Sequence, residues 1–304
     1  MILTQNKQSI VEKEGDVEDS VSMSIDQGSI HLLMSFLSKN VYSDNIGSLV
    51  RETVSNAWDA TKKSGKESPV IVLLERKNNG WEFSVEDKAL GLDQEDVDNV
   101  ISKYLASTKR NDNTQLGAIG IGFKSPLSYQ NSFTFRGRKN GVERTWMMYE
   151  DEYENKIDKL YETPTTEEDG VKVVVSIKGW DQSEFSQKIR EQLCYFSNIY
   201  VKDDYSTFNN DFKIYENELF KWSEVAGDNK LHMSLGEVYY PIDFKKLGIP
   251  DINLSVALKI NLDEGVTPTI NRENLMFSPE TKALIVGKIE KLADWMVEKW
   301  NQDN

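Results

Sequence analysis

The segment "RETVSNAWDA" places three polar side chains at the spacing of one helix face. Glu52, Asn56 and Asp59 stand at positions i, i+4 and i+7, and at 100° per residue they fall within about 60° of one another on a helix. Together they form one polar stripe of two carboxylates and an amide. Taken alone, such a stripe more often marks a solvated helix face, so its chemistry depends on the motifs that accompany it.

Two further elements follow the stripe. In "VEDKALGLD", Asp87 ends an expected strand and precedes a turn at Gly91, which puts a carboxylate at a strand end where ligands are often bound. In "GAIGIGFKSPLSY", Gly117, Gly120 and Gly122 allow close backbone approach and positive φ. Amide groups at a Gly-rich helix start can hold phosphate oxygens, helped by the helix dipole.

The spacing of these glycines decides between nucleotide-binding folds. A Walker loop has two glycines separated by four residues, and the second glycine is followed directly by Lys and then Ser or Thr. The segment "GAIGIGFKS" lacks that spacing. The segment also does not follow a strand in a βαβ unit, as a dinucleotide-binding loop would. In order and spacing, the three elements instead resemble the E-x-x-x-N-x-x-D-A, D-x-G-x-G and G-x-x-G-x-G boxes of the gyrase, heat-shock chaperone, histidine kinase and MutL (GHKL) ATPase superfamily.

This resemblance implies an α+β fold, a two-layer α/β sandwich of the Bergerat type that holds ATP and Mg²⁺ between its helical face and a mobile lid. Glu52 resembles the general base that activates the attacking water. Asn56 resembles the magnesium ligand, and Asp87 the acceptor for the adenine amino group. The positions that the resemblance assigns to nucleotide binding are Asp59, Asp87, Gly91, Gly117, Gly120, Ile121, Gly122, Phe123 and Lys124.

The polar segment before the glycines is expected to form the lid. Within it, "LASTK" resembles the Ser/Thr-Lys element of the chaperones and MutL, and it makes Ser107, Thr108 and Lys109 candidate lid contacts. Lys124 follows the glycines closely enough to approach a phosphate, but at a helix start it could equally be a solvated cation.

Two positions depart from the superfamily pattern. Ala89 replaces the first glycine after the adenine Asp, and a Cβ at positive φ would cost roughly 1 kcal/mol, so we expect a reshaped loop. Val171, in "DGVKVVV", stands where the family has a Thr that shares a water network with that Asp. These departures predict modest affinity or relaxed base selectivity.

A closer resemblance, to the rIIA-like proteins of bacteriophages, rests on "VRETVSNAWDA", "GAIGIGFKSPLSY", "VYYPID" and "PTINRENL". It implies that the second half is a transducer-like module whose "TINRENL" loop brings Arg272 to the γ-phosphate, since a guanidinium offers a bidentate fork to phosphate oxygens. The alternative is that Arg272 pairs with Glu273 or Glu264 on the surface.

The expected elements position these motifs in two domains, 1–182 for ATP binding and 183–304 for the smaller αβ unit. Apolar spacing predicts helices over Ile30 to Leu37 and Ile46 to Lys63, the second ending near Gly65. Alternating segments predict one mixed or antiparallel sheet covered on one face by helices. A long helix from Pro279 to Trp300 is expected to close the chain.

Composition limits the function further. A net charge of −14 opposes nonspecific binding to nucleic acid, and no apolar run is long enough to span a bilayer, so we expect a cytoplasmic protein, in the host bacterium if it is a phage protein. A histidine kinase needs a phosphorylated His on a dimerisation helix, whereas His31 is expected on an ordinary packed helix. Two hypotheses remain: a slow ATPase that switches domain or dimer contacts, with ADP, a second copy or a protein client as partners, and a nucleotide-dependent binding module without turnover.

Overall fold

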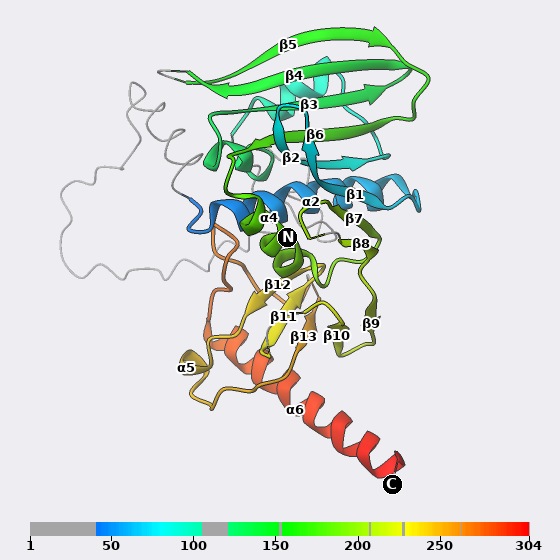
Figure 1. Ribbon diagram of the computed structural model, residues 1–304. Helices are drawn as coiled ribbons and strands as arrows, with labels where there is room; N and C mark the ends of the chain where they lie inside the picture. Colours follow the sequence, from blue (N-terminus) through cyan, green and yellow to red (C-terminus); the bar gives the residue numbers. More distant parts are fainter. Residues whose placement is uncertain are drawn as a thin grey trace, which may run out of the picture.

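The computed structural model describes residues 41–104, 121–151, 154–206, 208–226, 229–261 and 263–303. The helix expected over Ile30 to Leu37, with His31, lies outside them. The chain folds around two sheets, one above the other in Figure 1. The larger has eight strands in the order β5 (Asn155–Pro164), β4 (Val142–Glu150), β3 (Ser132–Lys139), β6 (Gly170–Ile177), β2 (Gly80–Asp87), β1 (Val70–Lys77), β7 (Ile199–Asp203) and β8 (Phe208–Asp211). The smaller has five, in the order β12 (Val238–Pro241), β11 (Leu231–Leu235), β13 (Val256–Ile260), β10 (Phe220–Ser223) and β9 (Ile214–Glu216).

Helix α2 (Asn45–Ser64) lies against one face of the large sheet, beside α4 (Gln182–Leu193) (Figure 1). The side chains of Leu49, Val50 and Val54 are fully buried on that face, and burying each stabilises the fold by about 1.5–3 kcal/mol relative to leaving it exposed. The helix begins where Asp44 accepts a hydrogen bond from the amide of Gly47, and it ends at Gly65 with φ of 69°. The helix predicted from the apolar spacing is therefore confirmed.

The large sheet is mixed, because β1 pairs antiparallel with β2 and parallel with β7. The β1 to β2 connection is the turn at Asn78 to Gly80, as its sequence predicted. Helices on one face of this sheet make a two-layer α/β sandwich, which confirms the predicted fold class. The smaller sheet follows it with the short helix α5 (Phe244–Leu247) and the long α6 (Pro279–Asp303), which projects at the bottom of Figure 1.

The change from one sheet to the other falls later in the chain than the 182/183 junction expected from the sequence. Strand β7 pairs with β1, and β8 pairs with β7, so both belong to the large sheet. The smaller sheet begins at β9. Parallel pairing of β7 with β1 buries Ile199 and Val201 against the first core, which explains why this segment stays with the first unit.

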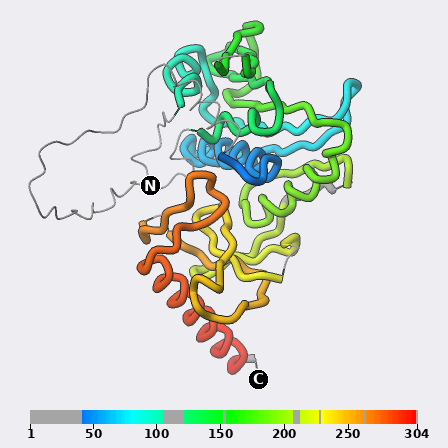
Figure 2. The backbone as a smooth tube through the Cα atoms, turned by 90° about the vertical axis from the view of Figure 1, so that its left-hand side faces the viewer, coloured from blue at the N-terminus to red at the C-terminus, as the bar shows by residue number. Residues whose placement is uncertain are grey.

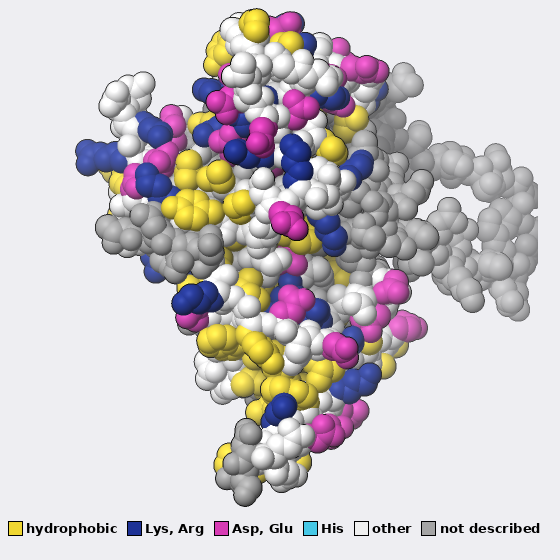
Figure 3. Space-filling view, turned by 90° about the vertical axis from the view of Figure 1, so that its right-hand side faces the viewer, with side chains coloured by type: hydrophobic (Ala, Val, Ile, Leu, Met, Phe, Trp, Pro, Cys, Tyr) yellow, Lys and Arg dark blue, Asp and Glu magenta, His cyan; other side chains and the backbone are white. Residues whose placement is uncertain are grey.

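The surface of the described residues is mixed in charge. On the side seen in Figure 3, Lys and Arg side chains stand among Asp and Glu side chains over the large sheet, while apolar side chains gather lower down. In the described part of the chain, no helix has both the length and the apolar character required to cross a membrane.

Candidate nucleotide site

The polar stripe of α2 faces the interior. Glu52 is 2% exposed and Asp59 is 1% exposed, while Asn56 is half-buried. Charged side chains are almost never buried in this way unless they are paired. The stripe is therefore no solvated helix face, and its partners tell what it can do.

Glu52 is held by two arginines, one on each carboxylate oxygen. Arg272 Nη1 lies 2.6 Å from Glu52 Oε2, and Arg51 Nε lies 3.2 Å from Oε1. Burial lowers the pKa of Arg272, but Glu52 and the hydroxyl of Tyr240, to which it is hydrogen-bonded, raise that pKa above its ordinary value overall. The guanidinium thus stays charged beside a carboxylate in a dry site, where electrostatic interactions are strong.

Arg272 reaches this position from the loop that precedes α6. In Figure 2 the orange tube of this loop rises to the blue tube of α2. Arg272 itself is 6% exposed and has φ of 54°, a left-handed conformation that costs a residue with a side chain roughly 1–2 kcal/mol. The surface alternative from the sequence does not describe this structure, because Arg272 is buried and Glu264 pairs with Lys288 instead.

Asp87 ends β2 and is 3% exposed. Burial raises the pKa of its carboxyl to about 7, although hydrogen bonds from the amides of Ala89 and Val171 oppose this rise. The Ala89 amide lies 3.0 Å from Asp87 Oδ1. Gly170 brings the neighbouring strand so close that an added Cβ would stand 2.1 Å from the carbonyl oxygen of Asp87. The neighbouring strand thus packs tightly on the Asp87 main chain, and the carboxyl is held out of solvent by amide hydrogen bonds from Ala89 and Val171.

The loop after Asp87 corrects one expectation and bears on another. Ala89 does not adopt positive φ, so it carries no strain, and the position that needs glycine is Gly91, with φ of 68°. There an added Cβ would lie 1.9 Å from the carbonyl oxygen of Arg138. Val171 pairs directly with Asp87 across the sheet, and it is an apolar residue at the position where the resemblance led us to expect a Thr.

Gly122 brings bare backbone against the stripe. An added Cβ would lie 2.8 Å from Glu52 Oε2 and 3.6 Å from Asn56 Nδ2. Its neighbours turn inward: Ile121 is buried, and the ring of Phe123 meets that of Phe135 at 5.1 Å between centroids. The part of this motif that faces the polar stripe is therefore its backbone at Gly122. The two apolar side chains point elsewhere.

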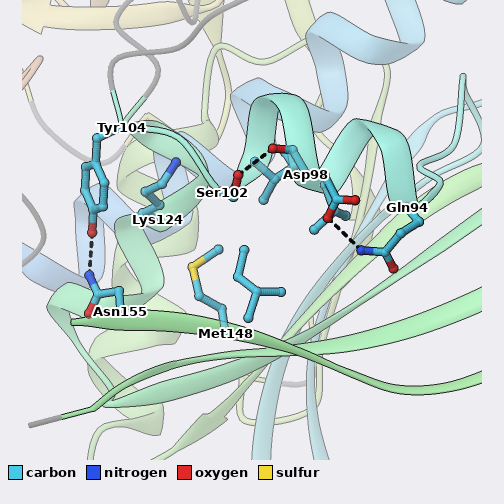
Figure 4. A pocket seen from close by; sticks show the side chains of 10 residues that line it. Gln94, Asp98, Ser102, Tyr104, Lys124, Met148 and Asn155 are labelled. Carbon is cyan, nitrogen blue, oxygen red and sulfur yellow. Dashed lines mark hydrogen bonds between the residues drawn. The ribbon is translucent and has the colours of Figure 1, made fainter. Parts of the chain in front are cut away.

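Lys124 is 5% exposed and lines a small cavity whose lining includes none of the three stripe residues. Its Nζ donates to the carbonyl of Lys103 at 2.9 Å and stands 4.9 Å from the ring centre of Tyr104 (Figure 4). Burial lowers the pKa of this amine to about 8. The cavity, about 180 Å³, is closed on other sides by Met148 and Asn155. Lys124 is thus a buried side chain and not a solvent-exposed one, and with a pKa of about 8 it still carries its proton at neutral pH.

The remaining predicted contacts lie outside the described residues. These are the lid candidates and the first two glycines of the third motif: Ser107, Thr108, Lys109, Gly117 and Gly120.

A magnesium ion would have one protein ligand here. Among the residues that the structure describes, no three His, Cys, Asp or Glu side chains gather as a metal cage. Mg²⁺ commonly keeps several waters and binds phosphate oxygens with only one or two protein groups. Asn56 beside Glu52 and Gly122 fits that mode of binding, in which the nucleotide supplies the other ligands.

Sequence reasoning assigned no role to Arg51 and Tyr240, and it considered Glu273 only as a surface partner of Arg272. Arg51 adjoins Glu52 in "VRETVSNAWDA", so its position beside the stripe was a usable signal. Tyr240 lies on β12 and is hydrogen-bonded to Arg272, and Glu273 lies in the Arg272 loop and contacts the start of α2. Nothing in their local sequence indicates either contact.

Comparison with known proteins points to the same region. Residues 45–178 match the family model described as "Histidine kinase-, DNA gyrase B-, and HSP90-like ATPase". The match begins at the first residue of α2 and includes Glu52, Asn56, Asp87 and Gly122. It supports the GHKL superfamily for this part of the chain and suggests that it binds ATP. A search of curated proteins found no match to the chain.

Proposed function

We propose that the protein binds ATP with Mg²⁺ at the site around Glu52, Asn56 and Asp87 and hydrolyses it slowly. Asp87 accepts a hydrogen bond from the adenine amino group. Asn56 holds the magnesium ion, which when bound neutralises charge on the phosphates. Glu52 takes a proton from the attacking water.

The buried contact of Glu52 with Arg272 carries this proposal. It joins a carboxylate on the nucleotide-site helix to a guanidinium from the second sheet's loop, at 2.6 Å and out of solvent. A guanidinium so placed is also within reach of an anionic group that enters beside Glu52. The switch of domain or dimer contacts then follows from transfer of Arg272 between the carboxylate and the γ-phosphate.

The state described also favours a second function, a nucleotide-dependent binding module without turnover. Both oxygens of Glu52 are engaged by arginines, so an attacking water would have to displace one of them or share an oxygen with it to reach the carboxylate. Val171 in place of the family Thr supports the same alternative through weaker adenine recognition.

Phosphate release in a single turnover separates the two functions. Excess protein is mixed with radiolabelled ATP and Mg²⁺, and free phosphate is followed in the wild type and in Glu52→Gln. Release that depends on Glu52 supports the ATPase. Binding of ATP without any release supports the binding module.

We further propose that the protein is related to the rIIA-like phage proteins. On this proposal it acts in the host cytoplasm, with a second copy of itself or a protein client as its partner. These proposals rest on the sequence motifs "GAIGIGFKSPLSY" and "PTINRENL". We also propose that a lid closes over the bound ATP. Its candidate residues lie outside the described part of the chain.

A further inference from the structure

Glu273 follows Arg272 and joins its loop to the start of α2. Its Oε1 accepts hydrogen bonds from the amides of Ser43 at 2.8 Å and Asp44 at 3.1 Å. Its Oε2 accepts one from the hydroxyl of Ser43, and the hydroxyl of Ser48 lies 3.4 Å from Oε1. One carboxylate therefore gathers two amides and two hydroxyls from the segment that begins the nucleotide-site helix.

The same carboxylate fixes its own loop. Asn271 Nδ2 donates to Glu273 Oε2 at 2.7 Å, while the carbonyl of Asn271 accepts from Arg51 Nη2 at 3.0 Å. Arg272 stands between these two residues with φ of 54°. Backbone in such a conformation persists only where surrounding contacts over-determine it. Contacts of Asn271 on one side and Glu273 on the other supply that constraint.

We infer that Glu273 is a positioning residue for Arg272. By tying the loop to Ser43 and Asp44, it holds the backbone from which the guanidinium reaches Glu52. Its effect on turnover rests on the proposed function, in which Arg272 moves from Glu52 to the γ-phosphate. A fixed backbone lets the guanidinium make that exchange by side-chain rotation, whereas a released loop takes it away from both partners.

The test is Glu273→Gln, which keeps the side chain's shape but removes the charge that the amides of Ser43 and Asp44 stabilise. We expect kcat to fall between roughly 10-fold and 100-fold, because small displacements of positioning groups have effects of that size. ADP affinity should stay within twofold, since Arg272 makes no contact with ADP in the proposal. The double variant Arg272→Ala with Glu273→Gln should turn over no more slowly than Arg272→Ala alone, because Glu273 acts through Arg272.

Glu264→Gln is the matched control. Glu264 is also a carboxylate between β13 and α6, but it pairs with Lys288 and not with α2. It should leave kcat unchanged. If Glu273→Gln does not fold, Glu273→Asp is measured instead. It keeps the charge but is one methylene shorter, and it should lower kcat by less than Arg272→Ala does.

Hydrogen exchange without nucleotide gives a readout independent of turnover. Glu273→Gln should raise exchange at the amides of Ser43 and Asp44, whereas Glu264→Gln should not. Unchanged exchange overturns the inference, and so do losses of kcat that add in the double variant. If the wild type does not hydrolyse ATP but exchange rises as expected, the proposed function fails and the positioning of the loop by Glu273 stands.

Discussion

Glu52 Oε2 and Arg272 Nη1 lie 2.6 Å apart although 220 residues separate them in the chain, and both side chains are buried. The contact means that the candidate general base is neutralised by a group from the second sheet's loop. Removing either partner therefore leaves a buried charge with less compensation, which makes both residues sensitive to substitution.

Arg272→Ala should lower turnover by about 10²-fold, the cost of one lost transition-state donor. ADP affinity should change little, because the proposed contact is with the γ-phosphate. Turnover and ADP binding are measured together, and small-angle scattering compares the ATP and ADP states. Full turnover in the variant, or a wild type with no ATP-specific change in shape, would rule out coupling through Arg272.

Glu52→Gln should keep ATP binding but lower the rate of hydrolysis by about 10²–10⁴-fold. The amide keeps the shape of the carboxylate but cannot act as a base. Equilibrium binding of ATP and single-turnover phosphate release test the two effects separately. Loss of binding with an unchanged rate constant for bound ATP would contradict the assigned role.

Asp87→Asn should weaken nucleotide binding and at the same time stabilise the fold at neutral and higher pH. Asp87 has a folded pKa of about 7 against an ordinary value of 3.8. The folded state thus keeps its proton longer than the unfolded state, and stability is lost as pH rises from near 4 through about 7. The loss is on the order of 4 kcal/mol at pH 8.

An amide carries no such penalty and can still accept from the Ala89 amide. Urea unfolding at pH 4 and pH 8 should therefore show similar wild-type and Asp87→Asn stabilities at the lower pH and a more stable variant at the higher one. Equal stabilities at both would mean that Asp87 is not desolvated as the structure shows.

The sequence predicted the elements whose local patterns are strong. Apolar periodicity and Gly65 located α2, and the Asn-Asn-Gly turn located β1 and β2. Strand β5 was missed because it is the exposed edge of the large sheet and carries charged residues instead of apolar alternation. The contact of Glu52 with Arg272 was beyond local reasoning, because only the packing of the second sheet's loop on α2 brings the two together.

Gly122→Ala should lower turnover and, because it disturbs a buried ion pair, also lower the melting temperature. An added Cβ would lie 2.8 Å from Glu52 Oε2, the oxygen that Arg272 contacts, so the carboxylate must leave its present position. We expect turnover to fall at least roughly 10-fold. Gly179→Ala is the control, because its Cβ would meet no atom within 4 Å. Thermal unfolding and turnover are compared for both; normal turnover in Gly122→Ala would place the reacting groups elsewhere.

Calorimetric titration of ATP, with and without Mg²⁺, tests the central claim most directly. The account predicts that the wild type binds ATP, that Mg²⁺ tightens this binding, and that Asn56→Ala loses the benefit of Mg²⁺. It further predicts that Asp87→Asn, folded and at least as stable at pH 8, binds ATP far more weakly. If the wild type does not bind ATP, or if Asp87→Asn binds it with wild-type affinity, the nucleotide site is not where these residues place it.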